Sequence, residues 1–255
     1  MPEYSGKLAV LHNEQYALNV SQALADRLAV PLYLNVDKNT AEDFFLSWRD
    51  GCLKLLDKEL LKKGGLTVDI EPRNGEQRSW PAPKNSALAQ AIGRKTKTVI
   101  DATTGWAQDS LHIFRMGYEL RCIERSPIML ELLGDAYLRL EQLDWVQRLS
   151  LSVPELIAGN AIGVLSELTE APECIYIDPM FPPKRKKSAL PKKSMLILRD
   201  LLGDDMDKEQ LFSTAMQATA KRVVVKSPDY AEPMGGTPSA SFKGKLLRYD
   251  VYLKN

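Results

Sequence analysis

An acid, a proline and an aromatic ring directly follow an apolar segment in the sequence CIYIDPMF, residues 174–181. Methyl transfer to an exocyclic base amine needs such groups, because the amine lone pair is delocalised into the ring. The carboxylate of Asp178 can accept an amine N–H and orient that lone pair, which is catalysis by positioning and electrostatics. Pro179 removes a competing backbone donor and stiffens the turn, and Phe181 offers a stacking face for an extruded base. An ordinary strand-to-loop turn is the alternative interpretation.

Two further acids end apolar segments earlier in the chain. Asp101 ends TVID and leads into a turn that contains Gly105, and Glu124 ends ELRCIE. Glycine at such a turn lets a ligand approach backbone N–H groups, and an acid about twenty residues on can accept hydrogen bonds from ribose hydroxyls. The run G-x-G-x-x-G is missing, which argues against a pyrophosphate cradle. An adenosine without phosphates, such as S-adenosyl-L-methionine (SAM), suits this pattern better.

A dense group of cations follows the segment CIYIDPMF. The formal net charge of the chain is only +1, so any affinity for nucleic acid must come from a local patch. Phosphate contacts from lysine and arginine position an RNA without reading its sequence. We therefore expect an RNA-binding loop, extended by Lys226 at the end of RVVVK, with a solvated loop as the alternative. The residues of this basic loop are Lys184, Arg185, Lys186, Lys187, Lys192 and Lys193.

Strands that alternate with helices must position these residues. We expect helices at 86–93, 109–116, 127–143, after 160, at 195–202 and at 207–221, and strands at 98–102, 119–124, 156–158, 173–178 and 222–226. This alternation predicts an α/β fold with a doubly wound, mostly parallel, seven-stranded sheet and an antiparallel C-terminal edge hairpin. Ligands of such sheets bind beyond the carboxyl ends of the strands, where the three acids lie.

The first part of the chain has a different pattern. We expect strands at 7–11, 31–36, 44–48, 52–56 and 66–70, and a helix at 21–29. The segment NGEQRSWPAPK, residues 74–84, is rich in polar residues and helix breakers and is the best linker. The sequence thus predicts a small mixed α/β subdomain over residues 1–80 and a larger domain over residues 81–255.

Composition narrows the class of protein. The chain has 255 residues, of which 44% are hydrophobic and 26% charged, as in ordinary globular proteins. We find neither a signal peptide nor an apolar run of roughly 20 residues. Three widely spaced cysteines indicate reduced, buried thiols, and His12 and His112 are isolated, so we expect no metal site. A cytoplasmic protein is the expectation.

Six segments spread over residues 101–252 carry a family resemblance. They are DATTG, CIERSP, YIDPMFP, KSALPKKSM, KRVVVKSPDYA and RYDVY. Residues 178–181 are similar to the Asn/Asp-Pro-Pro-Tyr/Phe motif of amine-methylating class I SAM-dependent methyltransferases. The whole set resembles, more closely, the bacterial ribosomal RNA small subunit methyltransferase J family.

The resemblance implies methyl transfer from SAM to the exocyclic N2 amine of a guanine in 16S ribosomal RNA (rRNA), with Asp178, Pro179 and Phe181 at the reaction centre. The family pattern has a second glycine and an arginine where this chain has Ala107 and Gln108. A methyltransferase of a protein or small-molecule amine, or a catalytically decayed RNA-binding protein of the same fold, is the alternative. The cofactor-binding set expected from the residues and the resemblance together is Asp101, Ala102, Gly105, Gln108, Asp109, Glu124, Arg125, Asn160, Ala161 and Asp178.

Overall fold

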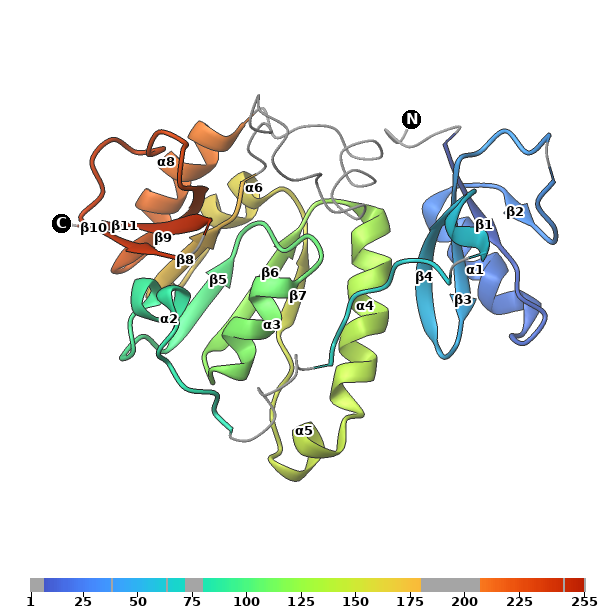
Figure 1. Cartoon of the computed structure of the whole chain (residues 1–255), viewed down its shortest axis with the longest axis horizontal. Helices are drawn as coiled ribbons and strands as arrows, with labels where there is room; N and C mark the ends of the chain where they lie inside the picture. The colour runs from blue at the N-terminus through green and yellow to red at the C-terminus, as the bar shows by residue number, and fades with distance from the viewer. Residues whose placement is uncertain are drawn as a thin grey trace.

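Two β-sheets organise the protein. The structure is a computed structural model that describes residues 7–37, 39–62, 64–71, 80–179, 207–244 and 246–254 (the backbone alone at residue 62). A four-stranded sheet has the order β2-β1-β3-β4, and a seven-stranded sheet has the order β10-β11-β9-β8-β5-β6-β7. The long helix α4 (Pro127–Glu141) lies between the N-terminal sheet and the larger one (Figure 1).

The large sheet is doubly wound, as the sequence predicts. Its parallel strands are β5 (Thr98–Asp101), β6 (Glu119–Glu124), β7 (Glu155–Ala158), β8 (Cys174–Ile177) and β9 (Arg222–Pro228). The terminal hairpin of β10 (Ala240–Lys243) and β11 (Leu247–Leu253) is antiparallel, and β11 pairs with β9. The strand order reverses at β5, which lies between β6 and β8. Such a switch point is where open α/β sheets bind ligands.

Helices cover both faces of this sheet. The first face carries α2 (Ala87–Ile92), α3 (Gln108–Arg115) and α4, and the second carries α6 (Ala161–Ser166) and α8 (Lys208–Ala218). Strand residues alternate between the two cores, since strand side chains point to opposite faces in turn. Tyr176 and Val224 belong to the first core, whereas Ile175 and Val223 belong to the second.

A side-chain cap fixes where α4 begins. Ser126 accepts a hydrogen bond from the Met129 amide at 3.3 Å, and Pro127 occupies the first turn of α4, where its missing N–H costs little. The helix expected at 127–143 ends at Glu141, and a short helix, α5 (Asp144–Arg148), follows it. The break arises because Leu143 takes an extended backbone conformation at the start of α5.

The N-terminal sheet contains β1 (Leu8–Leu11), β2 (Leu32–Tyr33), β3 (Phe44–Arg49) and β4 (Cys52–Asp57), with helix α1 (Leu18–Leu28) and the 3-10 turn η1 (Leu60–Lys62). Asp50 and Gly51, with φ of 51° and 77°, form the two-residue turn between β3 and β4. An Asp-Gly pair is favoured there because both positions need positive φ.

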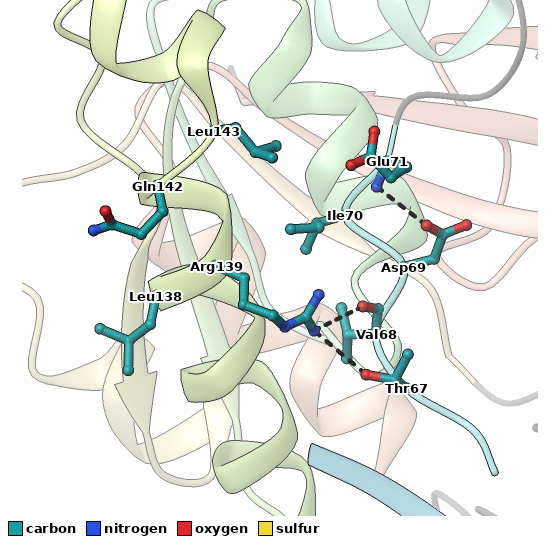
Figure 2. Close-up of a pocket in the computed structure, with 9 residues that line it drawn as sticks. All are labelled: Thr67, Val68, Asp69, Ile70, Glu71, Leu138, Arg139, Gln142 and Leu143. Atoms are coloured by element: carbon teal, nitrogen blue, oxygen red, sulfur yellow. Dashed lines mark hydrogen bonds between the residues drawn. The ribbon is translucent and has the colours of Figure 1, made fainter. Parts of the chain in front are cut away.

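The prediction of a strand at 66–70 is wrong. The segment forms only one isolated antiparallel β-bridge, between Leu66 and Leu55. The backbone beyond Leu66 bonds instead to arginine side chains. Arg139 Nη2 donates to the Val68 carbonyl at 3.2 Å, and Arg115 Nη2 donates to the Ile70 carbonyl at 2.6 Å. Figure 2 shows this segment running beside α4, with a pocket between them that none of the predicted site residues line.

Specific contacts join the N-terminal sheet to α4. The Leu53 amide donates to Asp135 Oδ2 at 3.1 Å, and Arg27 makes two hydrogen bonds of 2.8 Å to Glu131. One continuous core includes side chains of both sheets. The domain boundary at residue 80 stays a prediction. The helix expected at 195–202 and most of the linker lie outside the described residues.

Two other expectations concern the whole chain. Cys52, Cys122 and Cys174 are free and buried, as expected, and burial raises the pKa of the Cys122 thiol to about 12. Within the described ranges, we find no helix with the length and apolar character needed to cross a membrane.

Candidate active site

Asp101 shapes the turn that follows β5. Its Oδ1 accepts the Thr103 amide at 3.0 Å, and its Oδ2 accepts the Ser110 hydroxyl at 2.5 Å. The residue is 1% exposed, and burial raises the pKa of its carboxyl to about 7. Asp101 therefore ties the strand end to the first turn of α3, and its predicted contact with a cofactor stays a prediction.

Glu124 joins the turn after β5 to the turn after β6. Its Oε2 accepts the Gly105 amide at 3.0 Å, and its Oε1 accepts the Ser126 amide at 2.7 Å. Burial raises the pKa of this carboxyl. Gly105 has a φ of +49°, and a Cβ placed there would meet only the Thr103 carbonyl, at 3.9 Å. The backbone of this turn is thus open to a ligand on that side, next to a carboxylate with remaining acceptor capacity.

Ala107 adopts a conformation that favours glycine. Its φ is 54° at the N-cap of α3, in the left-handed region, where a Cβ costs roughly 1–2 kcal/mol. The family pattern noted above has glycine here, and the backbone geometry gives the physical reason. Gln108 follows as the first residue of α3. Ala102 lies just after β5, and its amide donates to the Tyr176 carbonyl of β8 at 2.9 Å, which continues the pairing of these two strands.

Asp178 stands beside the same turn. Its backbone N–H donates to Thr103 Oγ1 at 2.7 Å. Its Oδ2 lies 2.7 Å from Lys226 Nζ, and the side chain is about a third exposed, at 36%. The carboxylate is therefore fixed at the carboxyl end of β8, and its side chain remains partly exposed to solvent.

Lys226 bridges two carboxylates. Its Nζ lies 2.6 Å from Asp109 Oδ2 as well as 2.7 Å from Asp178 Oδ2, and the Tyr176 hydroxyl donates to the same Asp109 oxygen at 2.6 Å. Burial opposes the charged ammonium, but Asp178 and Asp109 outweigh it and raise the pKa of Lys226. The expectation that Lys226 extends the basic loop is therefore corrected, because its ammonium is engaged with these two acids.

Strand register explains this grouping. β8 and β9 pair Ile177 with Val225, so the next residues, Asp178 and Lys226, come side by side. On the other side, β11 places Tyr249 opposite Lys226, and burial raises the pKa of Tyr249 to about 12. Sequence reasoning missed the roles of Thr103, Ser110, Tyr176 and Tyr249. The alternation of faces along CIYIDP and RVVVK indicates that Tyr176 shares a face with Asp178 and Val224 with Lys226, but it does not indicate that the two strands are neighbours.

The other predicted residues lie at the ends of β6 and β7. Asn160 caps α6 by accepting the Ile162 amide at 2.9 Å, and Ala161 follows it. Arg125 Nη1 lies 3.8 Å from Asp207 Oδ2. Their contacts with a cofactor stay predictions. Phe181 and the six residues of the basic loop lie outside the described residues.

The residues present fit SAM. A sulfonium and an ammonium are cations, and ribose hydroxyls are donors, so the ligand requires acceptors of the kind that Glu124 and Asp178 provide. The open turn at Gly105 leaves backbone accessible between them. Among the residues described, no group of three or more His, Cys, Asp or Glu side chains could hold a metal ion.

The sheet order, the switch point at β5 and the acids at the strand ends define a class I SAM-dependent methyltransferase. A family model described as "Putative SAM-dependent methyltransferase" matches residues 28–254. A SAM-dependent methyltransferase from Neisseria gonorrhoeae has a similar solved structure, with a TM-score of 0.67 and 24% identity, and the match covers 96% of each chain.

Curated relatives narrow this class. A ribosomal RNA small subunit methyltransferase J of Shewanella amazonensis is 36% identical, over 85% of this chain and 89% of that protein. Proteins of the same name from Coxiella burnetii and Legionella pneumophila are 34% and 35% identical, over 96% and 93% of this chain and 96% and 94% of their own. The chain belongs to the ribosomal RNA small subunit methyltransferase J family, and its cofactor is SAM.

Proposed function

We propose that this enzyme transfers a methyl group from SAM to the exocyclic N2 amine of a guanine in small-subunit (16S) rRNA. The observation that carries the proposal is the fixed carboxylate of Asp178, held by Lys226 at the carboxyl end of β8 and joined through its backbone to the turn at Thr103. The curated relatives are named as methyltransferases of this rRNA, which supports the class of substrate.

Asp178 has two tasks in this chemistry. Bound SAM supplies an electrophilic methyl group on a sulfonium. The Asp178 carboxylate accepts one N–H of the guanine amine, which turns the nitrogen lone pair out of conjugation and toward the methyl donor. As the N–C bond forms and the S–C bond of the sulfonium breaks, with its electron pair left on sulfur, the nitrogen would lose a proton, and the partly exposed Asp178 side chain would offer that proton a path to solvent.

One aromatic residue, Phe181, and the basic loop complete the proposal. Phe181 stacks on the extruded guanine, because stacking replaces the contacts that the base loses when it leaves its neighbours. The basic loop, from Lys184 to Lys193, contacts rRNA phosphates and sets the position of the RNA without reading its sequence. Binding and chemistry are thus assigned to different residues.

Substitution of Asp178 tests the assignment of the reaction centre. Asp178→Ala should lower the single-turnover rate by roughly 10²–10³ at saturating rRNA and SAM, as expected for removal of one preorganised polar contact. Phe181→Ala should instead weaken productive docking of the base by about 1–3 kcal/mol.

Asp144→Ala is the control, because Asp144 is an exposed acid in the first turn of α5. Wild-type single-turnover rates in Asp178→Ala would remove Asp178 from the reaction centre. Methylation of a protein or of a small amine in place of rRNA would show that the substrate is wrong while leaving the cofactor site intact.

A further inference from the structure

A lysine and a tyrosine connect the proposed reaction centre to helix α3. Lys226 Nζ contacts Asp178 Oδ2 at 2.7 Å and Asp109 Oδ2 at 2.6 Å, and the Tyr176 hydroxyl donates to the same Asp109 oxygen. These groups come from β9, α3 and β8 and from the residue that follows β8. The lysine and Asp109 side chains are each 23% exposed, so the contacts are partly shielded from water and screened less than surface pairs.

The positions of these residues leave Lys226 little freedom. Tyr176 and Val224 share the α3 face of the sheet, and Asp178 and Lys226 follow two residues later on that same face. Tyr249 flanks Lys226 on β11. The ammonium is therefore directed toward α3 and Asp178 by strand register and not by side-chain flexibility alone.

We propose that Lys226 is a positioning residue for methyl transfer, which keeps the Asp178 carboxylate ionised and aimed at the target amine. This inference rests on the proposed function of Asp178. Lys226 itself stays protonated and takes no proton from the amine. Its ammonium compensates the repulsion between Asp109 and Asp178. Through Asp109 it also fixes α3, the helix that follows the turn at Gly105, relative to Asp178.

The charged and titratable groups around Asp178 determine the expected pH dependence. Asp101 acts on it from β5, Asp109 from α3 and Lys226 from β9, while Tyr176 and Tyr249 face the cluster from β8 and β11. A carboxylate that loses a contacting cation and keeps neighbouring acids becomes harder to ionise. Removal of the Lys226 charge should therefore make Asp178 protonate at a higher pH.

The test is the pH dependence of single-turnover methylation in Lys226→Met, which keeps most of the length of the side chain and removes its charge. We expect the rate at neutral pH to fall roughly 10- to 100-fold, since a displacement of about 1 Å at a reacting group can cost about 10² in rate. The acid limb of the profile should move up by about one pH unit. Lys226→Arg, which keeps the charge, should return the acid limb close to that of the wild type.

Lys221→Met is the matched control. Lys221 Nζ lies 2.6 Å from Glu173 Oε1. The two residues precede β9 and β8, at the ends of these strands away from Asp178, so the substitution removes an ion pair of similar length outside the site. Its rate and acid limb should equal those of the wild type. Lys226→Gln is the second neutral variant, and the affinity for SAM and the thermal midpoint are measured for each protein.

The outcomes separate this inference from the proposed function. An unmoved acid limb in a folded Lys226→Met or Lys226→Gln variant would overturn the role of Lys226, even where wild-type enzyme methylates rRNA. Loss of the folded state in both neutral variants would make Lys226 a residue of structural stability and would also overturn the proposal. Wild-type enzyme that methylates a different amine would contradict the proposed substrate, and the same pH comparison would then be made with that amine.

Discussion

Carboxyl groups of the same chemistry have different environments in this site. Asp101 is enclosed and bonded on both oxygens, Glu124 joins two backbone turns, and Asp178 is partly exposed to solvent. Asp101 shapes the backbone, whereas Glu124, which keeps acceptor capacity beside the turn at Gly105, and the partly exposed Asp178 are the acids expected to meet a ligand. The three positions therefore predict three different results on substitution.

Glu124→Ala should weaken binding of SAM by about 1–3 kcal/mol, the scale of hydrogen bonds to a charged group. The variant would lose the acceptor predicted for the ribose hydroxyls, and Gly105 and Ser126 lose their shared partner. Calorimetric titration with SAM measures this change. Unchanged affinity in a folded Glu124→Ala variant would remove Glu124 from the cofactor site.

Asp101 should make stability depend on pH. Burial raises its folded pKa to about 7 from an ordinary value of 3.8. Between these values the folded protein binds more protons than the unfolded chain, so this contribution to stability is present below about pH 4 and is lost as pH rises through about 7.

Urea unfolding of wild type and Asp101→Asn at pH 5, 6 and 7 measures this effect. Asparagine can still accept the Thr103 amide but does not ionise. The free energy of unfolding of Asp101→Asn should therefore improve relative to wild type as pH rises. A difference that stays constant across this range would contradict the raised pKa.

The sequence predicts part of this site and misses the rest for a physical reason. Acids at strand ends can be recognised from the sequence alone, because each ends or follows its own apolar segment. The bridge from Asp109 through Lys226 to Asp178 depends on which strands are neighbours and on their register. A lysine among other lysines gives no indication that it faces two acids.

At the scale of elements, the turn after β9 is anchored by a buried arginine. Arg248 makes two hydrogen bonds to Asp250, at 3.0 and 2.9 Å, and donates to the carbonyls of Pro228 and Ala231 at 2.8 and 2.6 Å. The two charged side chains are 8% and 1% exposed as residues. β11 thus fixes the backbone that follows Lys226.

Arg248→Met should lower the free energy of unfolding by about 3–5 kcal/mol, because it leaves the buried Asp250 charge without its cation and with the Ser241 hydroxyl as a neutral donor. Chemical denaturation measures the loss. Lys243→Met on β10 is the control, since Lys243 is exposed on the same hairpin, and it should change stability by less than about 0.5 kcal/mol. A loss of under about 1 kcal/mol in Arg248→Met would contradict this role.

Elements with strong periodicity are predicted well by the sequence. The five parallel strands and the terminal hairpin lie where they are expected. The apolar runs of β5, β6, β8 and β9 are largely buried between two layers of helices, which makes them conspicuous in the sequence. The segment 66–70 has similar composition but bonds to Arg139 and Arg115, and no local pattern reveals a side chain as the partner of a backbone.

At the scale of the whole molecule, the N-terminal sheet packs on α4, while the proposed reaction centre lies at the carboxyl ends of β8 and β9 (Figure 1). The net charge of +1 gives no general attraction to RNA. Affinity for rRNA is therefore expected to depend on local cations, above all those of the basic loop.

Replacement of Lys184, Arg185, Lys186 and Lys187 by alanine should weaken rRNA binding and flatten its salt dependence. Each phosphate contact that is lost should reduce the log–log slope by roughly 0.7–0.9. Affinity for SAM should not change. A slope equal to that of wild type, measured by filter binding at several salt concentrations, would indicate a solvated loop.

The most direct test of the proposed function identifies the methylated nucleoside. Purified enzyme is incubated with SAM that carries an isotopic label in its methyl group, together with 16S rRNA or small subunits from a strain that lacks the gene. The rRNA is then digested, and the nucleosides are separated and identified by mass and by retention against methylguanosine standards. We expect the label in N2-methylguanosine, with little label when Asp178→Ala replaces the wild type. Label in another nucleoside, or none in rRNA under conditions where SAM binds, would contradict the proposed function.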